Sequence, residues 1–336
     1  MSIQITIELP DTAFLHHTPN EFAQKMRLAA AEMAGEQSFL ETVKNEKGDL
    51  VARLEEQKKI NKQLEDLMAI TTHKFRGYLQ SIEYEDKKEL INEDVHIMNG
   101  LLNMINLISV SEDRLRKKLS QDMQGEGNLL VVLEHTLSRS LASLLTIYER
   151  EKIRQHYLNY AKKTSLVPAT TTRKQWKSDY LALERQIQAD WQSRFAEILK
   201  KPTLESLTTW LGERFFPLEV QGFVEAPIHF EPYGATESML RIIISELFVN
   251  AVKYYVSDTQ QPVQLSLACD VHRCQLRCAN PTRNKEQRIC KGNGKGHHFL
   301  FLLAQQLKGN FPEPPFVEDY VAEFNMPADL LMEKNV

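Results

Sequence analysis

The sequence lacks the features that would place the protein in a membrane or on a nucleic acid. No apolar run is long enough to cross a bilayer, and the N-terminus has no charged-then-apolar signal segment. The 41 lysines and arginines are interleaved with 45 aspartates and glutamates, so the charge provides no general nucleic-acid surface. We therefore expect a cytoplasmic protein that has neither a membrane nor a nucleic acid as its partner.

Cysteine is scarce, and its spacing argues against a structural zinc site. Such sites usually open with a tight two-residue pair of cysteines, and the four cysteines of this chain contain none. With period two, Cys269 ends the apolar face of one predicted strand, and Cys274 and Cys278 share a face of the next. We interpret them as core thiols, because reduced cysteine is among the most buried residue types.

The 336 residues, 42% of them hydrophobic, suffice for two or three domains with a core in each. The patterns predict an α+β protein. Its four parts are a strand and helix module at 1–37, charged helices at 38–119, a helical insertion at 120–215, and a mixed helix and strand domain at 216–336. For the insertion we expect two or three helices, with Trp176, Trp191 and Trp210 in the core.

The first part pairs a strand with a short helix. Residues 3–9, "IQITIEL", alternate as a strand, and a helix is predicted from Asn20 to Gly35. This opening resembles small antitoxin-like proteins that begin "ITIELP" and continue into "EFAQ" and "MRLAAA". The resemblance implies an interaction or dimerisation module, and the alternative is an N-terminal cap.

The charged helices begin with an imperfect heptad seam between residues 38 and 72. Its apolar members are Val43, Leu50, Leu54, Leu64 and Met68. Asn61 lies on the same seam and favours a paired coiled coil, since one polar seam residue fixes the register at some cost in stability. We expect a parallel homodimer, and a solvated connecting helix is the alternative.

The seam leads into "THKFRGYLQSI", residues 72–82, where one histidine lies off the apolar stripe. At about 100 degrees per residue, Phe75, Leu79 and Ile82 form the stripe and His73 points away from it. If a dimer axis doubles this helix and the next one, His73 lies on the outside of a four-helix bundle. An exposed histidine without a function is the alternative.

From residue 216 the pattern changes to strands combined with two helices. The predicted order is a strand, a helix over 235–255, a hairpin over 263–280, a polar loop over 281–296, a helix over 297–309 and a strand over 319–327.

The first of these helices carries Glu246 and Asn250 one turn apart. An acid and an amide on one face are able to hold a magnesium ion against nucleotide phosphates, although a solvated polar face has the same spacing. Gly292, Gly294 and Gly296 precede the second helix, where glycines let backbone amides approach phosphates. The two features together favour a nucleotide site.

The segment "ELFVNAVKYY" looks like the N box of the histidine-kinase and gyrase-like (GHKL) ATPase superfamily, and "GNGKGHHFL" looks like its last glycine box. The resemblance implies a Bergerat-type, two-layer α/β sandwich at 216–336 that binds ATP and Mg²⁺. It makes Asn250 the Mg²⁺ ligand, with Glu246 as its upstream polar partner, and it makes Lys253 and Tyr254 contacts to the phosphates and the base.

The segment "THKFRGYLQSI" is similar to the phosphoacceptor box of sensor histidine kinases, with His73 as the acceptor. The resemblance makes 38–119 a helical dimerisation and phosphotransfer bundle. Three positions depart from the family pattern. Lys74 replaces a common acid, Tyr78 replaces a usual proline, and "CANP" replaces the first glycine box, where Asn280 is able to accept a hydrogen bond from an adenine amino group.

The resemblance implies a soluble, ATP-dependent histidine kinase that autophosphorylates on His73 and passes the phosphoryl group to the aspartate of a response-regulator receiver domain. Two alternatives remain open. In one, Glu246 activates water and the protein is an ATP-driven conformational switch. In the other, the domain is a degenerate ATP-binding scaffold that acts by binding a partner.

Overall fold

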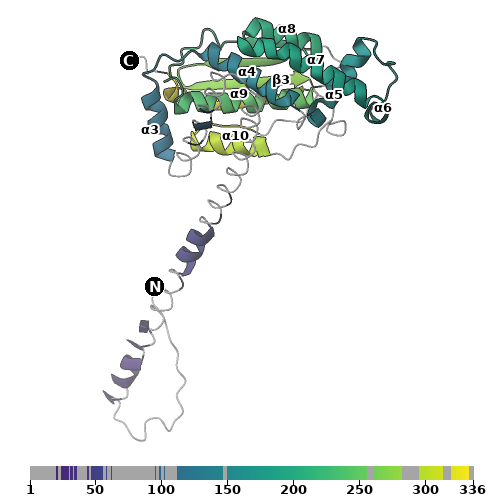
Figure 1. Cartoon of the computed structure of the whole chain (residues 1–336). Coiled ribbons are helices and arrows are strands. Elements are labelled where there is room, and N and C mark those ends of the chain that lie inside the picture. The colour runs from purple at the N-terminus through teal and green to yellow at the C-terminus, as the bar shows by residue number, and fades with distance from the viewer. Residues whose placement is uncertain are drawn as a thin grey trace. The chain divides into compact units, whose positions relative to one another are not determined.

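The computed structural model describes residues 112–146, 150–255, 261–281, 295–312 and 319–332, together with shorter helical stretches within 20–62 and 95–102. The chain divides into two compact units, a first unit at Met1–Gln63 and a second unit at Leu64–Val336 (Figure 1). The four-part division expected from the sequence stays a prediction.

The described part of the first unit is helical, and its longest stretch covers residues 47–55. Leu50 and Leu54, two members of the predicted seam, are 65% and 55% exposed in the single chain. Apolar side chains in this position are free to pack against a second helix. The predicted strand at 3–9 and the remaining seam residues lie outside the described part.

A four-stranded sheet in the order β1-β2-β3-β4 organises the second unit. The strands are β1 (Leu218–Gln221), β2 (Val263–Cys269), β3 (Arg273–Pro281) and β4 (Asp319–Pro327). β1 and β2 are parallel, and the other two pairs are antiparallel. The predicted hairpin and last strand are confirmed, and the strand expected from residue 216 is limited to the four residues of β1.

One face of the sheet covers the core. In β3, Cys274, Leu276 and Cys278 are buried, whereas Gln275 and Arg277 between them are partly exposed. This alternation is what a strand with one covered face requires, because successive side chains point to opposite sides. The interpretation of Cys274 and Cys278 as core thiols is confirmed.

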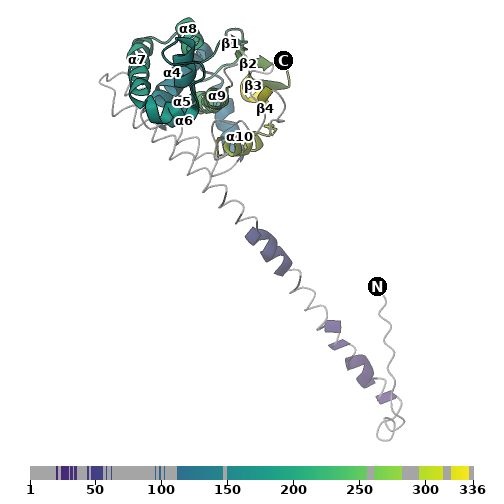
Figure 2. The same ribbon diagram turned by 90° about the vertical axis from the view of Figure 1, so that its right-hand side faces the viewer.

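Of the helices that the structure describes, two cover that face and five form a further layer. Between residues 112 and 332 the described helices are α3 (Glu112–Asp122), α4 (Leu129–Leu145), α5 (Arg150–Lys163), α6 (Arg173–Asp179), α7 (Leu181–Lys200), α8 (Leu204–Arg214), α9 (Ala235–Tyr254) and α10 (Lys295–Gln306). α9 packs on β3 and α10 on β4. α4 runs along α9, and α4 to α8 lie on the side of α9 away from the sheet (Figure 2).

The layers share one hydrophobic core that extends from Leu115 in α3 to Leu331 after β4. The α+β class is confirmed. The prediction of two or three helices for the middle region was wrong, because capping boxes at Thr172 and Thr203 start the short helices α6 and α8. The three tryptophans are buried, as expected. Within the described ranges, no helix has the length and apolar character to span a membrane.

Candidate functional site

α9 presents a line of polar side chains beside the core. Glu246 is buried, with 8% of its surface exposed, and Asn250, Lys253 and Tyr254 in the following turns are half-buried. Glu246, Asn250 and Lys253 are four and then three residues apart, so they share one side of the helix. The rest of α9, including the polar Glu237, Arg241 and Ser245, is almost wholly buried, so this side is where the helix is partly exposed.

The first turn of α10 lies against Glu246. A Cβ atom at Gly296 would fall 2.2 Å from Oε2 of Glu246 and 3.1 Å from its Cδ, so any larger residue there would displace the carboxylate. The free N–H groups at a helix start carry partial positive charge, which favours an acid in this position. The fold therefore brings the predicted acid and the last glycine of the predicted loop together.

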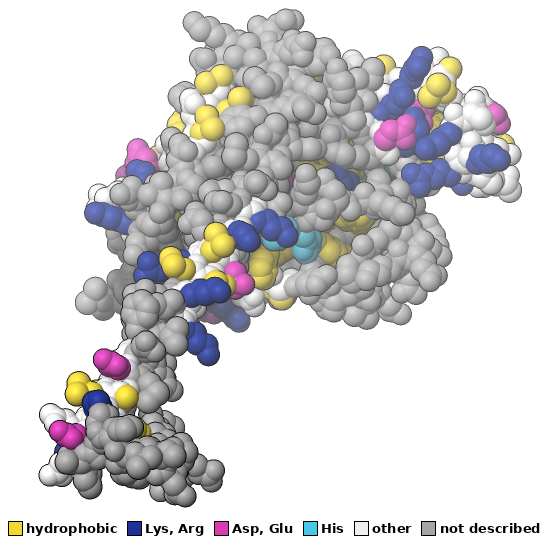
Figure 3. Space-filling view, turned by 90° about the horizontal axis from the view of Figure 1, so that it is seen from below, with side chains coloured by type: hydrophobic (Ala, Val, Ile, Leu, Met, Phe, Trp, Pro, Cys, Tyr) yellow, Lys and Arg dark blue, Asp and Glu magenta, His cyan; other side chains and the backbone are white. Residues whose placement is uncertain are grey.

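His297, the next residue, connects this turn to the sheet. Its ring Nε2 is hydrogen-bonded to the hydroxyl of Tyr320 on β4, and its ring packs on Phe311 with the centroids 4.9 Å apart. Figure 3 views the molecule from below and shows histidine side chains beside hydrophobic ones on the described surface. The sequence reasoning missed His297 and Tyr320 as site residues, although His297 directly follows the last glycine.

Tyr320 is the register partner of Asn280 on β3. Asn280 lies on the core face of the sheet and is 1% exposed, and neither its Oδ1 nor its Nδ2 has a hydrogen-bond partner. Leaving a buried polar group unpaired costs about 1–3 kcal/mol. A complete unpaired amide at this position is therefore a feature that the fold alone does not explain.

Other buried polar atoms also lack partners, among them the indole nitrogens of Trp176, Trp191 and Trp210. Each of those is one N–H on the edge of a large apolar side chain, and the burial of the ring compensates for it. Asn280 has no apolar bulk of comparable size, and it leaves a donor and an acceptor unpaired side by side. A ligand that offers an adjacent donor and acceptor would satisfy both.

The helical layer fixes the end of α9. Nε2 of His156 on α5 lies 2.7 Å from the carbonyl oxygen of Val252, and because a carbonyl oxygen only accepts, Nε2 carries the proton. Burial lowers the pKa of His156 to about 4, so the ring is neutral near pH 7. Val252 stands between Asn250 and Lys253 in the chain, so α5 holds the backbone from which both side chains project.

The described residues do not include all predicted site residues. His73 and its neighbour Lys74 lie outside them, as do Gly292 and Gly294. The structure thus places Glu246 against Gly296 at the contact of α9 with α10, and Asn250, Lys253 and Tyr254 further along α9. Asn280 lies on β3 opposite Tyr320, which contacts His297 of α10.

No protein-family model matches the chain, and no curated protein matches its sequence. Solved structures that resemble it include the histidine kinase AdeS of Acinetobacter baumannii, at 12% identity and a TM-score of 0.28 over 52% of this chain and 94% of that one. A histidine kinase from Burkholderia phymatum STM815 is also 12% identical, with a TM-score of 0.26 over 54% of this chain and 98% of that one. These values do not assign an activity to this chain.

Proposed function

We propose that this chain is an ATP-dependent histidine kinase, with a site for ATP and Mg²⁺ formed by α9, the first turn of α10 and the paired residues Asn280 and Tyr320. The observation that carries the nucleotide site is the Asn280 amide, which is buried with both polar atoms unpaired. Adenine presents an amino donor next to a ring-nitrogen acceptor on one edge, which is the complement of an amide. Asn280 would thus contact the base in place of the absent first glycine box.

The phosphates would lie between α9 and the start of α10. Backbone amides of the loop with Gly292, Gly294 and Gly296 would approach them at the positive end of α10. The amide oxygen of Asn250 would hold Mg²⁺, a hard cation that keeps several waters and binds phosphate oxygens. Lys253 would neutralise phosphate charge, and Tyr254 would flank the base.

The γ-phosphoryl group would then pass to His73. The bond from the γ-phosphorus to its bridging oxygen breaks, a phosphorus–nitrogen bond to the imidazole forms, and ADP leaves. Because Lys74 follows His73, the imidazole proton goes to Glu246 or to solvent. An aspartate of a response-regulator receiver domain would take the phosphoryl group next, and pairing of the exposed Leu50 and Leu54 would make the protein a homodimer.

One observation favours a second candidate function. Glu246 is buried beside Gly296, where it would lie close to the phosphates and is able to activate a water molecule. In that case the protein hydrolyses ATP and acts as an ATP-driven switch, and His73 is not modified.

The nucleotide site is tested with Asn280→Leu, which keeps the approximate size of the side chain and removes both unpaired atoms. We expect the free protein to gain about 1–3 kcal/mol of stability in urea unfolding, because the cost of the orphan amide disappears. The rise in melting temperature on adding ATP and Mg²⁺ should be lost, because the base contact is gone.

Gln275→Leu is the matched control, since Gln275 is on the same strand but on the opposite face, where its amide donates to Oδ1 of Asn325. This variant should keep the full response to ATP. If Asn280→Leu also kept it, the amide would have no role in binding and the proposed site would be wrong.

The two activities are separated with γ-labelled ATP. The kinase predicts an acid-labile, alkali-stable label that His73→Gln abolishes while the thermal response to ATP persists. Steady phosphate release without any label, equal in the native protein and in His73→Gln, would support the ATP-driven switch instead.

A further inference from the structure

The end of the sheet away from Asn280 holds two thiols opposite each other. Cys269 ends β2, Cys274 is near the start of β3, and the two are direct register partners. The N–H of Asp270 donates to the carbonyl of Arg273 at 2.8 Å, which makes that pair the hydrogen-bonded one. By the alternation of an antiparallel ladder, Cys269 and Cys274 form the next, non-hydrogen-bonded pair, with their side chains on the same face.

This geometry suits a disulfide. Non-hydrogen-bonded partners have Cα atoms about 4.5 Å apart, inside the range of about 4.4–6.8 Å that disulfides span. Both cysteines are free thiols in the structure. Cys269 is half-buried, whereas Cys274 is 0% exposed and its thiol donates to Sδ of Met332 at 3.7 Å.

The two thiols differ in reactivity. Interaction with the Cys274 side chain lowers the pKa of Cys269, against the smaller opposing effects of partial burial and of the Asp270 carboxylate. The same interaction and burial raise the pKa of Cys274. Cys278 lies further along the same face of β3, and burial raises its pKa to about 12. A half-buried thiol with a lowered pKa beside a second thiol is the arrangement of oxidation-sensitive cysteines.

We propose that Cys269 and Cys274 are a peroxide-sensitive dithiol that closes to a cross-strand disulfide. The Cys269 thiolate attacks one oxygen of a hydroperoxide, the O–O bond breaks, and a sulfenic acid forms while hydroxide or an alkoxide leaves. The Cys274 sulfur then displaces the sulfenic oxygen, so an S–S bond forms and the Cys274 proton leaves in a water molecule. A thiol reductant restores both thiols by exchange. This site does not rest on the proposed nucleotide site.

The test uses the full chain with Cys290→Ser, so that only the three described cysteines remain. After hydrogen peroxide, the protein is denatured, alkylated and analysed by mass spectrometry. Relative to the reduced and alkylated protein, we expect a mass lower by two alkyl groups, a peptide that joins Cys269 to Cys274, an alkyl group on Cys278 alone, and reversal by dithiothreitol. Without peroxide, native Cys269 should be alkylated at least about tenfold faster than Cys278.

Three variants assign the roles. In Cys274→Ser the reaction should stop at the sulfenic acid, which dimedone traps on Cys269. In Cys269→Ser no oxidation should occur at the same peroxide concentration. Cys278→Ser is the matched control from the same strand face and should still form the disulfide. A disulfide to Cys278 or to a second chain would overturn the proposal. So would a peroxide-treated protein without substitutions at Cys269 and Cys274 in which both of these cysteines are still alkylated afterwards.

Discussion

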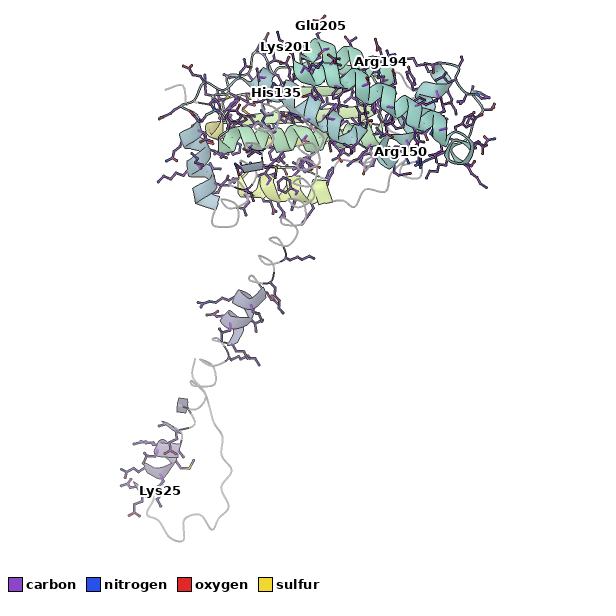
Figure 4. The ribbon with its side chains drawn as sticks, viewed as in Figure 1. Lys25, His135, Arg150, Arg194, Lys201 and Glu205 are labelled. Atoms are coloured by element: carbon purple, nitrogen blue, oxygen red, sulfur yellow. The ribbon has the colours of Figure 1, made fainter. Side chains whose placement is uncertain are left out.

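Two enclosed polar side chains, Glu184 on α7 and Asn280 on β3, differ in whether the fold provides them with partners. On α7, Glu184 is fully enclosed, and its carboxylate lies 3.2 Å from Nε of Arg150 and 2.8 Å from Nε of Arg154. Figure 4 labels Arg150 at the α5 end of this layer. Asn280 is almost equally enclosed and has no partner. The ion pairs of Glu184 explain why a carboxylate is buried in the helical layer. No contact among the described residues explains the buried amide of Asn280, so we attribute its role to a ligand.

The largest effect is expected from breaking the satisfied network. Glu184→Gln removes the carboxylate that Arg150 and Arg154 share, and breaking such a buried pair costs about 3–5 kcal/mol, because among the described residues Arg154 keeps only the exposed Glu151 as a partner. Urea unfolding measures it. The exposed pair of Lys200 with Glu197 is the control, where Glu197→Gln should change stability by less than about 1 kcal/mol. Similar costs for both variants would remove the contrast between framework and surface.

A smaller effect is expected at His156, where the helical layer meets α9. Its folded pKa of about 4 is below the ordinary 6.5, so the unfolded chain binds the proton first as the pH falls. Stability should therefore decline between about pH 6.5 and pH 4, by up to about 3 kcal/mol from this residue. Urea unfolding across that range checks the slope against His156→Gln, which should lack this contribution. Equal slopes would mean that the ring is not buried in its neutral form.

The smallest stability effect, with a clear effect on binding, is expected at Gly296. In Gly296→Ala the new Cβ pushes the flexible end of Glu246 aside, so folding should change by no more than about 1 kcal/mol. Affinity for ATP with Mg²⁺ should fall about tenfold, a shift of about 1.4 kcal/mol, because the carboxylate leaves its place at the start of α10.

Gly212→Ala on α8 is the control for this substitution, because nothing lies within 4 Å of the added methyl group. It should stabilise the protein by about 0.5–1 kcal/mol through helix propensity and leave ATP binding unchanged. Equal nucleotide affinities in the two variants would argue against a role for the contact between Gly296 and Glu246.

Sequence patterns were sufficient for β2 to β4 and the two covering helices, because β3 alternates as a strand with one covered face and α9 is a long apolar run that is buried almost all round. They were not sufficient for β1, which is much shorter than the predicted strand. The helical layer was harder to predict. α6 has only seven residues, too few for a periodic stripe, and its start depends on the capping box at Thr172.

Some residues of the candidate site were also predictable from the sequence, and others were not. Glu246 and Gly296 could be selected from local spacing and from the glycines before a helix. Tyr320 could not, because its place opposite Asn280 depends on the register of β3 with β4, strands that are far apart in the sequence. The pairing of Cys269 with Cys274 was accessible in principle, since the two-residue turn between Asp270 and Arg273 fixes that register.

The packing of α3 and α4 on α9 limits how the chain can be dissected. Oδ2 of Asp122 accepts the N–H of Thr236 at the start of α9, and the hydroxyls of Ser140 and Ser245 meet at 3.0 Å between α4 and α9. A fragment cut at residue 216, where the sequence pattern changes, would lose both contacts and present a bare apolar flank of α9 to water. Such a fragment should aggregate, whereas a longer fragment cut before residue 112 keeps this flank of α9 covered and should stay in solution.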